Sequence, residues 1–186
     1  MEKMRLWWKF EGRYILPGIK RGLINIWKWL PVIWKDRGYD HIFIFDILLK
    51  KLELQAECLT KYANHIQWEY DVSRINWCIR LIRLLKDDVY ELEYMDYHEA
   101  THEFIPVDST EEMYEMKSEY FNENFSEFFK KYKLQYKIAK GLSDEEWPYN
   151  DRSDKCIAMW ISSNNHVRAR RLLFKILDRY IEHWWD

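Results

Sequence analysis

A histidine–glutamate pattern is the residue group with the most definite chemistry in this chain. His98, Glu99 and His102 stand in the order His-Glu-x-x-His. On a helix, residues four positions apart share a face, so both imidazoles could bind one Zn²⁺ while the glutamate activates a water molecule. Residues 103–106, which follow the pattern, end in a proline, whereas a zinc hydrolase normally continues the helix through its site. We therefore favour the alternative interpretation, a solvated helix end.

Carboxylates spaced about one helical turn apart form a second candidate site. The acidic run holds two such pairs, Asp88 with Glu91 and Glu93 with Asp96. All-α nucleoside triphosphate pyrophosphohydrolases hold Mg²⁺ between carboxylates of two facing helices, and here Glu53 and Glu57 would supply the facing pair. Those two are spaced four apart instead of three, which weakens the prediction because Mg²⁺ demands near-octahedral geometry. The alternative is a solvated acidic face.

Rings and cations form a third candidate, a ligand-binding site. Its residues lie in two groups, Trp34 with Lys35 and Arg37, and His166 with Arg168, Arg170 and Arg171. Arginine forks bind phosphates through two hydrogen bonds, and bases stack on indoles, so the site would suit a small nucleotide. The net charge of −2 argues against broad nucleic-acid binding, because such domains are usually basic. The alternative is that the tryptophans are core residues and the cationic heads extend into solvent.

Apolar residues at helical spacing predict the elements that would position these sites. We expect helices over about 19–35, 41–63, 71–98, 110–140 and 154–185, after a short Trp-rich segment that ends at Pro17. Pro31 predicts a kink or a break near Leu30, Asp71 an N-cap, and Asn164-Asn165 an interruption of the last helix. The fold class predicted is all-α, a compact bundle-like or orthogonal packing of five to six helices in a single domain, 1–186.

Charge and composition limit the remaining possibilities. Residues 1–37 carry nine Lys/Arg against three acidic residues, and we expect this basic, Trp-rich N-terminal segment to pack on the domain. A helix on a membrane surface would have a similar composition. No run of 18 apolar residues occurs, so a membrane span is not expected. Three cysteines without metal-ligand spacing indicate reduced thiols, and eleven tryptophans make homo-oligomers plausible.

Segments from three parts of the chain carry a resemblance. They are WKWLPVIWKDRGYD (27–40), RLIRLLKDDVYELEYMDYHE (80–99) and RARRLLFKILDRYIEHWWD (168–186), and they resemble segments of a group of uncharacterised bacteriophage proteins. The group has no assigned activity, so the resemblance implies an origin and no mechanism. It implies a phage accessory protein in the cytoplasm of the infected bacterial host, or a component of the virion.

These observations predict a non-catalytic interaction protein. It would bind a host or viral protein partner or a small nucleotide, without a resident cofactor, and nucleotide sequestration would give it a counter-defence role. No GxSxG, P-loop or GxGxxG motif and no cysteine beside a histidine is present, so nucleophile chemistry is not expected. The alternative is a metal-dependent hydrolase that uses Zn²⁺ at His98, Glu99 and His102, or Mg²⁺ at the carboxylate pairs.

Overall fold

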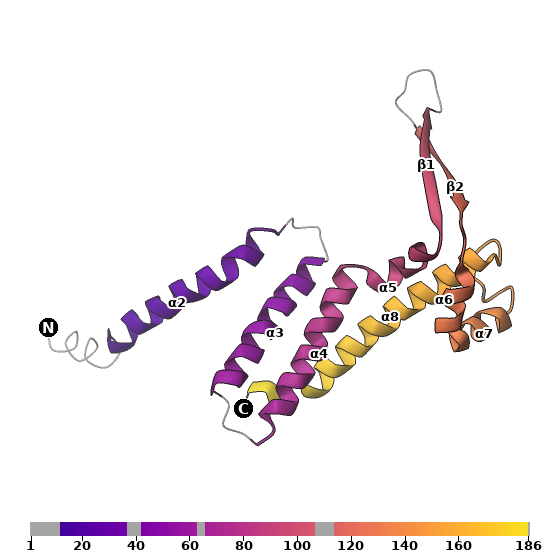
Figure 1. Ribbon diagram of the computed structural model, residues 1–186. Coiled ribbons are helices and arrows are strands. Elements are labelled where there is room, and N and C mark those ends of the chain that lie inside the picture. The colour runs from indigo at the N-terminus through magenta and orange to yellow at the C-terminus, as the bar shows by residue number, and fades with distance from the viewer. Residues whose placement is uncertain (1–11, 37–41, 63–65, 107–113, 186) are drawn as a thin grey trace. The chain divides into compact units, whose positions relative to one another are not determined.

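A computed structural model describes residues 12–36, 42–62, 66–106 and 114–185 (Figure 1). Within these residues the chain is mostly helical, with seven α-helices, two short 3-10 helices and one two-stranded sheet. The prediction of a helical protein is confirmed, but the sheet means that the fold is not purely all-α. The chain consists of two compact units, Met1–Ile79 and Arg80–Asp186.

The first unit contains α2 (Gly12–Ile33), α3 (Ile42–Tyr62) and most of α4 (Trp68–Lys86). α2 is continuous through both Pro17 and Pro31, so the expected end at Pro17 and the expected break near Leu30 are wrong. Each proline removes one i→i−4 hydrogen bond of the helix, and α2 nevertheless continues past both. α2 contacts α3.

The start of α4 differs from the prediction by three residues. The helix begins at Trp68, so Asp71 lies in its first turn and does not cap it. Asp71 is buried, and its carboxylate accepts a hydrogen bond from the Arg74 guanidinium at 2.9 Å. An acidic residue in the first turn still stabilises the helix, because it faces the positive end of the helix dipole.

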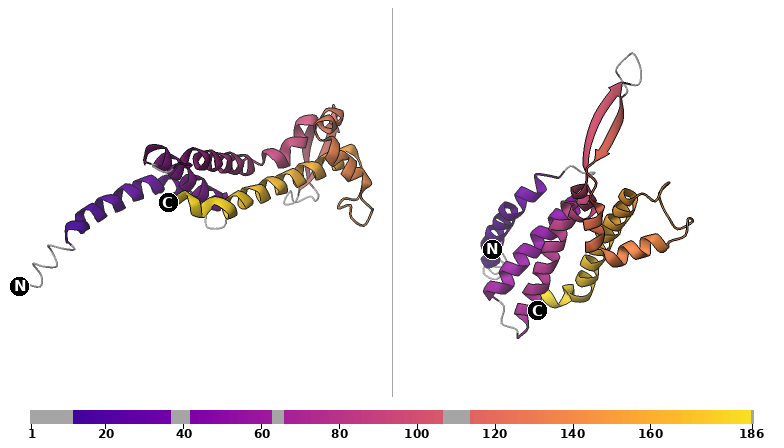
Figure 2. Two further views of the ribbon diagram at one scale, coloured as in Figure 1. Left: turned by 90° about the horizontal axis from the view of Figure 1, so that it is seen from below. Right: turned by 45° about the vertical axis from the view of Figure 1, so that its right-hand side comes forward.

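The second unit contains short elements followed by one long helix (Figure 2). In chain order after α4 they are α5 (Val89–Leu92), η1 (Glu93–Tyr97), β1 (Glu99–Pro106), β2 (Tyr114–Phe121), α6 (Phe125–Lys131), α7 (Lys133–Gly141), α8 (Asp154–Tyr180) and η2 (Ile181–Trp185). α5, α6 and α7 all contact α8, which is the element that the unit is built around.

Two predicted helices are confirmed only in part. The helix expected over 71–98 ends at Lys86, because Asp88 adopts a left-handed backbone (φ 47°) that no α-helix continues through. The helix expected over 110–140 is replaced by β2 and the shorter helices α6 and α7. β1 and β2 form an antiparallel hairpin, with Thr101 opposite Glu119, and it projects from the helices (Figures 1 and 2).

An aromatic core holds α6 and α7 against the first half of α8. Phe125, Phe128 and Phe129 are buried together with Trp147, Ile157 and Ile161. α8 begins where the sequence predicts, with Ser153 as its N-cap: the Ser153 hydroxyl accepts a hydrogen bond from the Cys156 amide. The helix runs through Asn164-Asn165 without the expected interruption. No helix among the described residues is long and apolar enough to cross a membrane.

Candidate ligand-binding groove

The histidine–glutamate pattern does not lie on a helix. His98 follows the end of η1 in an extended conformation, and Glu99 to His102 belong to strand β1. Four extended residues span ~13 Å, so the two imidazoles are too far apart to bind one ion. His98 Nδ1 lies 3.2 Å from the Tyr94 carbonyl oxygen, and His102 Nδ1 lies 2.8 Å from the Ser118 hydroxyl. The helical geometry expected of a zinc hydrolase is therefore absent from these residues.

Two of the carboxylates considered for Mg²⁺, Glu57 and Glu93, have partners within their own units. In the first unit, Glu57 pairs with Lys61, which lowers the pKa of that carboxyl. In the second unit, both oxygens of Glu93 accept hydrogen bonds, one from Lys131 and the other from the Tyr132 hydroxyl at 2.6 Å. The Glu57 pair lies within α3, whereas the Glu93 contacts join η1 to the end of α6. Both oxygens of Glu93 are already hydrogen-bonded.

The predicted ring-and-cation residues are divided between the two units. Trp34 and Lys35 lie in the turn after α2 and are exposed, while Arg37 falls outside the described residues. His166, Arg168, Arg170 and Arg171 lie on α8 in the second unit. The second group is the one for which the structure shows a surrounding site.

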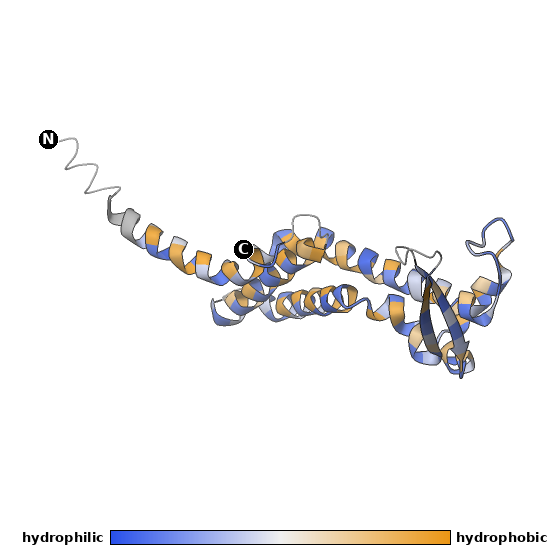
Figure 3. Ribbon diagram, turned by 90° about the horizontal axis from the view of Figure 1, so that it is seen from above, coloured by the Kyte–Doolittle hydropathy of each residue, from blue (hydrophilic) through white to orange (hydrophobic). Residues whose placement is uncertain are grey.

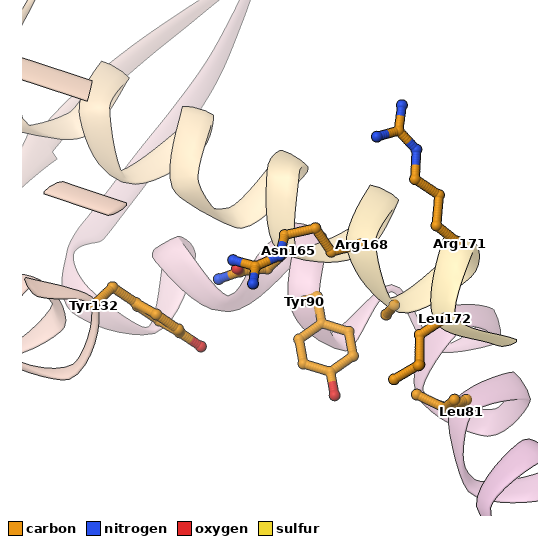
Figure 4. Close-up of a pocket in the computed structure, with 8 residues that line it drawn as sticks. Leu81, Tyr90, Tyr132, Asn165, Arg168, Arg171 and Leu172 are labelled. Carbon is orange, nitrogen blue, oxygen red and sulfur yellow. The ribbon is translucent and has the colours of Figure 1, made fainter. Parts of the chain in front are cut away.

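A groove of about 490 Å³ lies along α8 (Figure 4). Residues of α4, α5, α6–α7 and α8 line it: Leu81, Tyr90, Tyr132, Asn165, Arg168, Ala169, Arg171 and Leu172. Of the predicted residues, Arg168 and Arg171 line the groove, and His166 and Arg170 do not. In Figure 4 the Arg168 side chain extends alongside Asn165, on the side of the tyrosines, whereas the Arg171 guanidinium points away from them.

Besides Arg168, the polar side chains of Asn165 and Tyr132 line the groove. The Asn165 side-chain nitrogen is buried and has no hydrogen-bond partner among the described residues, so it is a donor available to a ligand. The Tyr132 hydroxyl donates to Glu93, and burial together with that hydrogen bond raises the pKa of Tyr132 to about 12. Tyr132 therefore stays neutral at physiological pH, and its ring is fixed in position. The groove combines a cation, an amide donor and two phenol rings.

A second cluster surrounds His166. Its Nδ1 lies 4.0 Å from Asp88 Oδ1 and 3.7 Å from Glu91 Oε2, and the candidate ligand atoms all lie within 4.8 Å of one another. That nitrogen is buried without a hydrogen-bond partner among the described residues. Two carboxylates and an imidazole could hold a divalent cation, or the carboxylates could pair with protonated His166. At 100° per residue, His166 and Arg168 point to sides of α8 about 160° apart, so this cluster is separate from the groove.

Sequence reasoning found the cations of α8 but not their surroundings. Tyr90 and Tyr132 carry no local signal of a ligand site, and Asn164-Asn165 suggests only a helix interruption. The one-turn spacing of Asp88 and Glu91 was visible, but nothing in the sequence connects that pair to His166. No family model, curated protein or solved structure matches this chain.

Proposed function

We propose that this protein is a non-catalytic binding protein whose second unit takes a small nucleotide in the groove along α8. The observation that carries the proposal is the combination of the Arg168 guanidinium, the unpartnered Asn165 amide and the Tyr90 and Tyr132 rings around one space. A guanidinium binds phosphate oxygens through two parallel hydrogen bonds. Aromatic rings offer faces on which a base stacks.

The size and lining of the groove agree with this ligand class. A volume of about 490 Å³ falls within the ~300–1,000 Å³ usual for small-molecule sites. Leu81, Ala169 and Leu172 supply apolar surface, and the few polar groups would fix the orientation of the ligand. The resemblance to bacteriophage proteins supports a role in the infected bacterial cell, where sequestering a nucleotide would counter a host defence that depends on it.

Titration calorimetry of the full chain with mono-, di-, tri- and cyclic nucleotides tests the proposal. We expect at least one nucleotide to bind, and Arg168→Ala to weaken that binding at least tenfold, because a hydrogen bond to a charged group contributes about 1.5–3 kcal/mol. Arg170→Ala is the matched control, since Arg170 is an exposed arginine of the same helix that does not line the groove. Equal affinity for both variants, or binding of no nucleotide, would refute the proposal.

Metal-dependent hydrolysis is the second candidate, and the cluster of Asp88, Glu91 and His166 favours it. The chain is incubated with each nucleotide in the presence of Mg²⁺, Mn²⁺ or Zn²⁺, and products are separated by chromatography. Released product that disappears in His166→Gln would replace the binding role with a catalytic one. Stable binding without product supports the binding role.

A further inference from the structure

Helix α2 has an apolar face that no other described element covers. Among its described side chains, residues 17–33, this face consists of Ile19, Leu23, Ile26, Trp27, Leu30 and Ile33, and Trp34 continues it in the following turn. Each of these side chains is at least 40% exposed, and Trp34 is 83% exposed. At 100° per residue they fall within about 120° of the helix circumference. Figure 3 shows apolar residues recurring along α2 between polar ones.

The contact between α2 and α3 does not use this face. Among residues 17–36, only Trp29 and Val32 are partly buried, and both lie outside the apolar arc. The apolar face is therefore directed away from the neighbouring helix. It is nevertheless the part of α2 whose burial would be most favourable.

A cationic arc adjoins the apolar face. Lys20, Arg21 and Lys28 lie along one of its borders, in line with Lys35 after the helix, and residues 12–35 contain no aspartate or glutamate. Trp27 and Trp34 lie on the same border, between the apolar and the cationic arcs. An indole has an apolar ring and a polar N–H. It is therefore suited to a position between an apolar phase and water.

We propose that α2 lies flat on an anionic lipid surface, with its apolar face among the acyl chains and its lysines at the head groups. The occupant is a lipid surface and not a protein because the apolar face adjoins a row of cations and no acidic side chain occurs in residues 12–35. A helix of 22 residues covers ~33 Å of such a surface. Apolar burial and attraction to anionic head groups then act together.

Vesicle co-sedimentation of the full chain tests the proposal. We expect binding to vesicles of phosphatidylcholine and phosphatidylglycerol (7:3) and little binding to phosphatidylcholine alone, with loss of binding as salt is raised. The double variant Lys20→Gln/Lys28→Gln should bind about 25-fold more weakly, since each cation near the surface contributes about fivefold. No binding to the anionic vesicles would overturn the proposal.

The apolar face is tested by Trp27→Ser/Trp34→Ser, which changes two exposed side chains. We expect at least a tenfold loss of vesicle binding, while Phe104→Ser, an exposed ring on β1, binds like the parent chain. Circular dichroism confirms that each variant is folded. If Trp27→Ser/Trp34→Ser instead leaves vesicle binding unchanged and abolishes self-association in lipid-free sedimentation velocity, the face binds a second copy and the proposal is wrong.

Discussion

Loss of the Phe128 side chain should strongly destabilise the second unit. Its side chain is fully buried, and its ring centroid lies 5.2 Å from that of Tyr97, 6.0 Å from that of Phe129 and 4.9 Å from that of Tyr132. Replacement by alanine leaves a cavity between α6 and α8, and buried Phe→Ala changes of this kind cost about 4 kcal/mol. If the free energy of unfolding falls by about 2 kcal/mol per M of urea, the urea midpoint of unfolding should fall by about 2 M.

Urea unfolding followed by circular dichroism measures this effect, with Phe104→Ala as the control. Phe104 is a ring of the same size that is 66% exposed, so its loss should change the free energy of unfolding by less than about 0.5 kcal/mol. Phe128→Ala should also weaken nucleotide binding, because Tyr132 loses the ring that supports it. If the two variants lower the midpoint equally, the aromatic core is not what stabilises this unit.

Three further predictions concern single side chains. The pKa of Tyr132 is raised to about 12 from an ordinary value of 10.0, so the folded state binds this proton more tightly than the unfolded state does. The resulting stabilisation is present below pH ~10 and is lost as the pH rises from there towards about 12. Tyr132→Phe should remove that loss of stability in urea titrations at high pH. Burial raises the pKa of the Cys78 thiol to about 11, so a thiol reagent at pH 8 should modify the exposed Cys58 quickly and Cys78 only after urea unfolds the chain. Ser153→Ala should lower the free energy of unfolding by about 1 kcal/mol, because α8 loses its N-cap, and an unchanged urea midpoint would contradict that role.

α8 shows what periodic burial predicts well. Ile157, Ile161, Leu173 and Leu177 recur at helical spacing, and all four are buried in the helix that the pattern indicates. The predicted end of the helix expected over 110–140 is confirmed to within one residue, because α7 ends at Gly141. Long helices with one buried face are predictable because the same side chains determine both the local conformation and the packing.

The hairpin shows where that reasoning fails. Residues 114–121 read YEMKSEYF, in which Tyr114, Met116 and Tyr120 alternate with charged residues as in a strand, although Glu, Met and Lys are also good helix formers. Both faces of β2 are mostly exposed, so burial does not distinguish the two interpretations. Apolar spacing over 110–140 also does not show that Asn122 adopts a left-handed backbone (φ 54°) between strand and helix.

The groove was only partly predictable, because it depends on residues far apart in the sequence. The cations of α8 could be recognised locally. Their neighbours Tyr90 and Tyr132 reach the groove only because α5 and α6 pack on α8, and Asp88 reaches His166 only because its left-handed backbone turns the chain after α4. Such positions follow from tertiary packing, which no local pattern encodes.

The hairpin also determines how this protein can be handled at high concentration. Among the described residues no third strand joins β1 or β2, so each strand has an outer edge on which a strand of another molecule could template an intermolecular sheet. Four glutamates on the two strands place negative charge on the ribbon, which opposes such pairing: Glu99, Glu103, Glu115 and Glu119. Replacing them with neutral side chains would remove that charge, and the projecting ribbon would then become the segment most prone to fibril formation.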